Sequence, residues 1–234
     1  MASAESFNRV STTADRIAVW LSKHWLAVIN AFLAVYVGLP FMAPVLMETG
    51  HPLAANVIYT IYAPMCHQLP QRSYFLFGEK ATYSIEDLAN RVGVENLAWY
   101  PWPRFFNGDR HLGYKVALCE RDVAIWGGLL LSGLAFGLVR LRVKPLPFLA
   151  YLLIGVVPMG LDGGSQLISY LVPSLLGGVP RESTWVLRTI TGGLFGWATA
   201  WLVFPYLHIS FAEIGEVSSR RLVESAPPMP VKES

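Results

Sequence analysis

Four long apolar stretches constrain the fold of this 234-residue chain more than any other feature of its sequence. They cover approximately residues 25–47, 123–139, 146–172 and 187–207. A bilayer core about 30 Å thick is crossed by a helix of roughly 20 apolar residues. Only 15% of the residues are charged, whereas an average soluble domain has roughly 25%. The sequence therefore predicts an all-α integral membrane protein, a helical bundle with four transmembrane helices.

A fifth apolar stretch, residues 52–65, is too short to cross the bilayer comfortably and contains Asn56, Thr60 and Pro64. A short helix that re-enters the membrane or lies in its interface suits this segment better than a full crossing. A tilted fifth crossing is the alternative, and it would place the two ends of the chain on opposite sides of the membrane.

Basic residues in short loops predict the orientation of the bundle, because Lys and Arg favour the cytoplasmic side. The tightest loop contains Arg140, Arg142 and Lys144, and further arginines precede the first span and follow the last. With four spans, both termini lie on the same side as this loop. We therefore expect both termini in the cytoplasm and the long loop between the first two spans outside.

This topology divides the chain into three parts. We expect residues 1–24 to form a cytoplasmic amphipathic segment, residues 25–212 the polytopic membrane domain, and residues 213–234 a disordered cytoplasmic tail with three prolines. Within the membrane domain, an extracytoplasmic loop covers residues 67–118. Its aromatic segment, residues 99–106, is expected at the outer headgroup level, and a lid that binds a partner is the alternative.

The four-span topology brings the side chains that could bind a metal to the outer side of the membrane. Cys66 and His67 follow the short apolar segment, and Cys119 and Asp122 lie one helical turn apart where the second span begins. Two thiolates, an imidazole and a carboxylate suit zinc or copper, so these four residues are candidate ligands. Two alternatives stay open: a disulfide between Cys66 and Cys119, and a helix cap formed by Asp122.

Charged and polar residues from other segments reach the same side. Asp162, on the third span, is the leading case because an ionisable side chain inside a membrane is costly to bury. It could accept hydrogen bonds from Gln166 or pair with Arg188, either as a structural lock between spans or as part of a substrate or proton path. The candidate polar-site residues are Arg72, Arg121, Asp162, Gln166, Arg181, Glu182 and Arg188.

Small residues recur at four-residue spacing on two of the spans. Gly133 and Gly137 lie on the second span, and Gly192, Gly196 and Ala200 lie on the fourth. Such stripes allow close helix packing and predict a compact bundle. Contacts with a partner protein are the functional alternative.

Several motifs, taken in order, resemble those of a known family. They are Cys66-His67-Gln68-Leu69-Pro70-Gln71-Arg72-Ser73, Cys119-Glu120-Arg121-Asp122, Asp162-Gly163 with Gln166, and Leu187-Arg188 with Thr191-Gly192. This order is similar to an uncharacterised family of small bacterial and archaeal polytopic membrane proteins, known as a domain of unknown function. That family has C-x-R-C where this chain has Asp122, a change that keeps a ligand but weakens the case for a Cys-rich structural zinc site. The resemblance implies the architecture, the site location and a prokaryotic inner membrane, and it implies no activity.

The expected function is that of an accessory or binding subunit of a membrane complex, with a polar, metal-binding site at its extracytoplasmic face. The expected partners are the lipid bilayer and other membrane proteins, and the formal net charge of +2 argues against nucleic acid. A transporter of a metal ion or small polar solute is the first alternative. An enzyme that acts on lipid-linked or thiol substrates ranks lower, because no nucleophile–base–oxyanion set is visible.

Overall fold

Four long helices form the protein. The computed structural model describes residues 2–92, 102–139, 143–172 and 181–225. In this part of the chain, four helices have the length and apolar composition to cross a bilayer. They are α1 (Ala2–Glu48), α6 (Glu120–Val139), a continuous helix made of α7 (Phe148–Tyr151), the π-helical turn η2 (Leu152–Val156) and α8 (Val157–Leu171), and α9 (Trp185–Glu224). The prediction of an all-α membrane bundle with four spans is confirmed.

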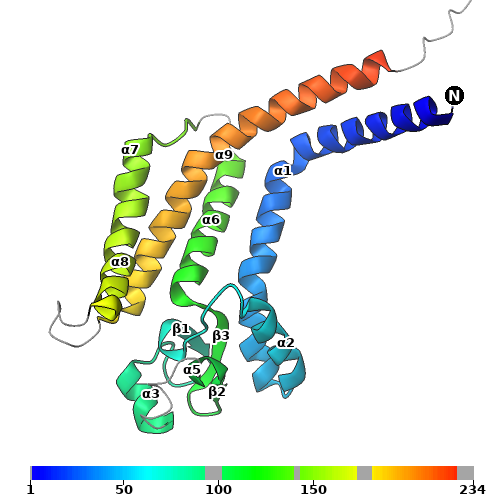
Figure 1. Cartoon of the computed structure of the whole chain (residues 1–234). Helices are drawn as coiled ribbons and strands as arrows, with labels where there is room; N and C mark the ends of the chain where they lie inside the picture. Colours follow the sequence, from blue (N-terminus) through cyan, green and yellow to red (C-terminus); the bar gives the residue numbers. More distant parts are fainter. Residues whose placement is uncertain (1, 93–101, 140–142, 173–180, 226–234) are drawn as a thin grey trace, which may run out of the picture.

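The short fifth helix, α2 (Pro52–Tyr62), has 11 residues, which rise about 16 Å and cover only about half of a bilayer core. It runs beside the C-terminal end of α1 (Figure 1). One face of α2 is buried, including Ile58 and Tyr62, whereas Leu53 and Val57 on another face are exposed. This length fits the predicted interfacial helix and does not fit a fifth crossing.

Glycines allow α6 and α9 to pack side by side at the centre of the bundle (Figure 1). A Cβ atom at Gly196 would overlap the main-chain oxygen of Ile125, and one at Gly192 would lie 2.9 Å from the main-chain oxygen of Arg121. Neither position leaves room for a side chain without moving the helices apart. The small-residue stripe of the fourth span therefore serves helix packing within this chain, as the compact bundle requires.

The ends of α1 and α9 leave the bundle together on the side opposite to the strands (Figure 1). Gly215 and Ser218 of α9 are buried, and Gly215 lies against Ser22 of α1. The prediction of a disordered tail is therefore wrong for residues 213–224, because packing against α1 supports a helix there. Residues 226–234 lie outside the described part, as do Arg140 and Arg142 of the predicted topogenic loop. The cytoplasmic placement of these ends stays a prediction.

The loop between α2 and α6 folds into a small domain that the sequence did not predict. Its antiparallel sheet has the order β1-β3-β2. The elements are η1 (Pro70–Arg72), β1 (Ser73–Leu76), α3 (Ile85–Val92), α5 (Trp102–Phe105), β2 (Gly108–Asp109) and β3 (Gly113–Cys119). Phe75, Tyr83, Leu88 and Leu112 form its core. Trp99 and Tyr100 of the predicted aromatic segment lie outside the described residues.

The small domain is joined to the bundle without a linker. Strand β3 ends at Cys119, and helix α6 begins at Glu120. Leu118 and Ala117 of β3 are buried in a core with Ala43 of α1 and Ile58 of α2. The residues on both sides of this junction are therefore held in fixed positions relative to α1 and α2.

Candidate functional site

Three of the four predicted metal ligands lie together at the junction of the small domain and the bundle. The ligand atoms of Cys66, Cys119 and Asp122 all lie within 4.8 Å of one another. Cys66 comes from the turn after α2, Cys119 ends β3, and Asp122 is in the first turn of α6. His67 is exposed and lies outside this group.

Cys66 is the buried residue of this cysteine cluster, which we define as Cys66, Cys119 and Asp122, and the other two residues are half-buried. The main-chain N–H groups of Gln68 and Cys119 donate to it at 3.4 and 3.2 Å. Interaction with the neighbouring Cys119 side chain, aided by the N–H of Gln68, lowers the pKa of Cys66 against the effect of burial. The same contact between the two sulfurs, together with burial, raises the pKa of Cys119.

The remaining contact of the cluster joins Cys119 to Asp122. The Cys119 thiol donates to Asp122 Oδ2 at 3.1 Å, and the Asp122 N–H donates back to the sulfur at 3.5 Å. Both cysteines are free thiols in the structure, so the disulfide alternative is not the form seen here. A cavity of about 170 Å³, lined partly by Met65, Cys66 and His67, opens beside the cluster.

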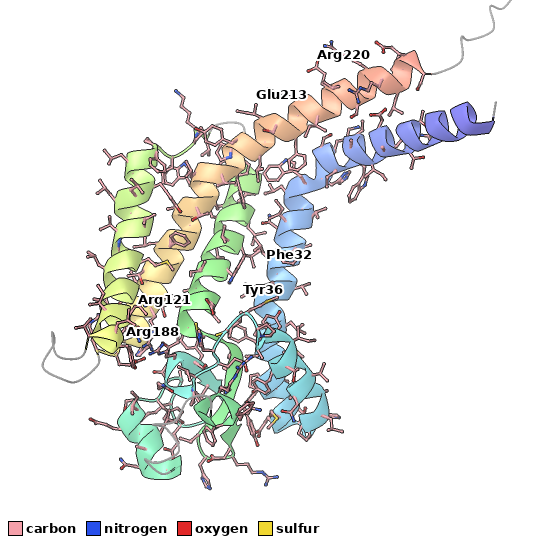
Figure 2. The ribbon with its side chains drawn as sticks, in the orientation of Figure 1. Phe32, Tyr36, Arg121, Arg188, Glu213 and Arg220 are labelled. Carbon is pink, nitrogen blue, oxygen red and sulfur yellow. The ribbon has the colours of Figure 1, made fainter. Side chains whose placement is uncertain are left out.

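A second polar group lies where α6, α8 and the start of α9 meet. The Asp162 carboxylate is almost fully buried and pairs with Arg121 at 2.6 Å and with Arg181 at 3.0 Å. The Ser183 hydroxyl lies 2.6 and 2.8 Å from its two oxygens. Figure 2 shows Arg121 and Arg188 at the end of the bundle that adjoins the strands.

A third group is centred on Glu182. Arg72 binds its carboxylate through two nitrogens at 2.6 and 2.9 Å, and Arg188 binds it as well. The side chains of Gln166 and Tyr170 also donate to it, at 3.1 and 2.8 Å. These contacts lower the pKa of Glu182 even though burial opposes the shift, and Arg72 makes the largest contribution to the lowering.

The seven predicted polar-site residues are thus brought together, but two of the predicted pairings are wrong. Asp162 pairs with neither Gln166 nor Arg188 in the structure, because Gln166 reaches Glu182 and Arg188 reaches Glu120 and Glu182. Gln166 lies one turn farther along α8 than Asp162 and so meets the segment before α9. The carboxylate of Asp162 is already engaged by two arginines and a hydroxyl. This arrangement favours a lock between helices over a polar path, since buried charges are tolerated when they are paired.

Two buried charged residues escaped the sequence reasoning. Glu120 is 1% exposed and pairs with Arg188 at 3.2 Å. The sequence feature that could have identified Glu120 is a carboxylate directly before Arg121 at the beginning of a span. Lys115 is fully buried in β3 and donates to the main-chain oxygen of Gln68 at 2.8 Å. The sequence feature that could have identified Lys115 is a lysine directly before an apolar run. This feature indicates burial only once the packing of β3 is known.

Comparisons with known proteins agree with this architecture. Residues 110–202 match the model of a family described as "Predicted membrane protein (DUF2085)". The chain is 27% identical over 191 residues to an uncharacterised protein, MJ1492, of Methanocaldococcus jannaschii, and the match covers 79% of this chain and 93% of that protein. No solved structure matches the chain. The resemblance that the motifs predict is confirmed: the chain is similar to a family of membrane proteins of unknown function.

Proposed function

We propose that this chain is a multi-pass protein of a prokaryotic inner membrane that binds one zinc or copper ion at its extracytoplasmic face. Cys66, Cys119 and Asp122 are the ligands of this proposal. The observation that carries it is the convergence of three ligand atoms from separate elements within 4.8 Å. Two thiolates with a carboxylate form a donor set that suits zinc or copper better than magnesium or calcium.

The coordination that this set supplies is incomplete. Zinc in proteins usually takes four ligands, and structural sites are closed by protein side chains. The cysteine cluster offers three ligands, and the cavity beside Cys66 and His67 has room for a fourth from water or from a partner protein. The two main-chain N–H groups that face the Cys66 sulfur support its thiolate form, which is the form that binds a metal.

The arrangement of charges supports an accessory or binding role over autonomous transport. Asp162 and Glu182 are each paired with two arginines from other elements of the chain. Such pairs hold helices in register, whereas a transport path needs polar groups that are free to bind a solute. A rigid bundle that presents one metal at its outer face fits a subunit of a larger membrane complex.

Elemental analysis of the protein purified under reducing conditions tests the metal site. We expect close to one equivalent of zinc or copper in the wild-type protein and its loss in Cys66→Ser and in Cys119→Ser. Asp122→Asn should retain less metal, whereas Glu48→Gln, an exposed acid at the end of α1, should match the wild type. Protein without either metal, with Cys66 and Cys119 joined in a disulfide, would contradict the proposal.

Two further measurements test the rest of the proposal. A membrane-impermeant maleimide should label Lys80→Cys, in the small domain, on intact cells, and it should label Arg220→Cys, near the end of α9, only after the cells are opened. The opposite pattern would overturn the orientation.

Purification in a mild detergent should retain a second membrane protein at constant ratio, and a chain that is always isolated alone would contradict the accessory role.

A further inference from the structure

A cavity of about 420 Å³ lies between the small domain and the outer ends of α6 and α9. This volume falls in the range of roughly 300–1,000 Å³ that is typical of small-molecule sites. The cavity is separate from the cysteine cluster. Its walls come from four places: Gln71 in η1, residues 82–86 before and within α3, Glu120 at the start of α6, and residues 182–185 with Arg188 around the start of α9.

The hydrogen-bond acceptors that line this cavity differ in the number of donors that they bind. The Glu182 carboxylate accepts hydrogen bonds from four different side chains. The carboxylate of Glu120 accepts one, from Arg188 at 3.2 Å, although an ionised carboxylate can accept about four. The amide oxygen of Gln71, which also lines the cavity, is buried and has no hydrogen-bond partner in the part of the chain that the structure describes.

The two under-satisfied residues are neighbours. One guanidinium nitrogen of Arg188 donates both to Glu120 Oε2 at 3.2 Å and to the main-chain oxygen of Gln71 at 3.4 Å. Arg188 is therefore already engaged with protein acceptors. Buried acceptors without a donor are rare in folded proteins, and they commonly indicate a bound water, ion or ligand. The missing partner of the Gln71 oxygen is a hydrogen-bond donor. The cavity lining carries three carboxylates, of Glu86, Glu120 and Glu182, against the one guanidinium of Arg188, and this excess of negative charge favours a donor with positive charge.

The opening of the cavity has a different chemistry. Trp185 and Ile85 line it and are 49% and 42% exposed, and the buried Tyr83 is a third residue of the lining. Glu86, another lining residue, is an exposed acid. Aromatic faces attract cations and also pack against apolar groups. A ligand that fits both regions carries a cationic donor at one end and apolar atoms next to it.

We propose that this cavity binds a primary amine, whose ammonium group donates to Glu120 and to the side-chain oxygen of Gln71. The apolar part of the amine lies against Trp185 and Tyr83. Two sources supply this chemistry at the outer surface of a membrane: a free amine, and the ammonium of an aminophospholipid headgroup such as that of phosphatidylethanolamine.

The test uses the full-length protein and compares matched ligands. Phenethylamine should raise the thermal unfolding temperature of the protein in detergent, and phenethyl alcohol, which has the same apolar body without the charge, should not. In nanodiscs, phosphatidylethanolamine should stabilise the protein relative to phosphatidylcholine if the source is a lipid headgroup. If phenethylamine stabilises the protein and phosphatidylethanolamine does not, the source is a free amine.

Gln71→Met is the informative variant. It replaces a side chain whose oxygen has no partner with an apolar one of similar length, so the fold should be kept or slightly stabilised. The loss of a charge-assisted hydrogen bond should weaken amine binding by about tenfold or more. Glu86→Gln, at the opening, should weaken it less. The proposal is overturned if neither phenethylamine nor phosphatidylethanolamine stabilises the protein. It is also overturned if the alcohol stabilises as much as the amine, or if Gln71→Met binds the amine like the wild type.

Discussion

Lys115 offers a quantitative test of how the small domain is held together. Its ammonium group donates to the main-chain oxygens of Gln68 and Arg104, and its side chain is fully buried. Burial lowers the pKa of Lys115 from 10.5 to about 7. Between these two pH values the unfolded chain binds more protons than the folded chain. The free energy of unfolding should therefore rise with pH across this interval, and this contribution should be lost as the pH falls towards 7.

The magnitude follows from the linkage relation. Each pH unit within the interval contributes about 1.4 kcal/mol, so from pH 8.0 to 9.5 the wild-type protein should gain about 2 kcal/mol relative to Lys115→Met. Loss of the two hydrogen bonds shifts the stability of the variant by an amount that does not depend on pH, and the slope is therefore the diagnostic quantity.

The assay is unfolding of the purified protein in mixed micelles by titration with a denaturing detergent, followed by tryptophan fluorescence. Lys80→Met is the matched control, because Lys80 is an exposed lysine of the same small domain. Its stability should follow the wild-type pH profile in this range. Parallel profiles for the wild type and Lys115→Met would refute the reasoning, since they would show that burial does not alter the proton affinity of Lys115.

Three other substitutions and one control test the ion pairs and the helix packing by thermal unfolding in detergent. Glu120→Gln removes one counter-charge of the buried Arg188 and should cost about 3 kcal/mol; a stability equal to that of the wild type would contradict a paired lock. Gly196→Ala places a methyl group against a main-chain carbonyl of α6 and should cost about 1–3 kcal/mol or more. Gly160→Ala, which would meet no atom within 4 Å, should be neutral, and equal effects at the two glycines would argue against this packing. Asp162→Asn leaves two arginines without a carboxylate and should destabilise the fold. A fully stable variant that has lost transport of a solute would favour a transport path.

The four spans could be predicted because hydropathy is a local property of the chain. Roughly 20 apolar residues can satisfy their backbone groups in a membrane only as a helix or as part of a closed barrel. The ends of the outer helices could not be placed in the same way. Helix α9 continues to Glu224 because Gly215 packs against Ser22 of α1, and this contact joins the two ends of the sequence.

The sheet of the small domain escaped prediction for a related reason. Its strands have 4, 2 and 7 residues, which is too short for a clear alternating pattern. The pairing that defines it joins Ser73 to Cys119, residues that lie far apart in the sequence. The Lys115 side chain is buried against Tyr59 and reaches the main-chain oxygens of Gln68 and Arg104, so its position in the sequence gave little sign of its environment.

The sequence predicts that three of the candidate ligands lie on the same side of the membrane, and which side that is stays a prediction. Topology alone placed Cys66, Cys119 and Asp122 on one face, and the structure brings their ligand atoms together. The pairing partners of Asp162 depend on how each helix is rotated about its axis, and hydropathy does not determine that rotation. The same limit hid Glu120, which follows Cys119 directly and pairs with Arg188 on α9.

X-ray absorption spectroscopy at the metal edge tests the central proposal most directly, with the protein loaded with one equivalent of zinc. We expect two sulfur ligands at about 2.3 Å and the remaining nitrogen or oxygen ligands at about 2.0–2.2 Å. One sulfur should be lost in Cys66→Ser and one in Cys119→Ser. A spectrum with only nitrogen and oxygen ligands, or one that neither serine variant changes, would contradict a metal site built from Cys66, Cys119 and Asp122.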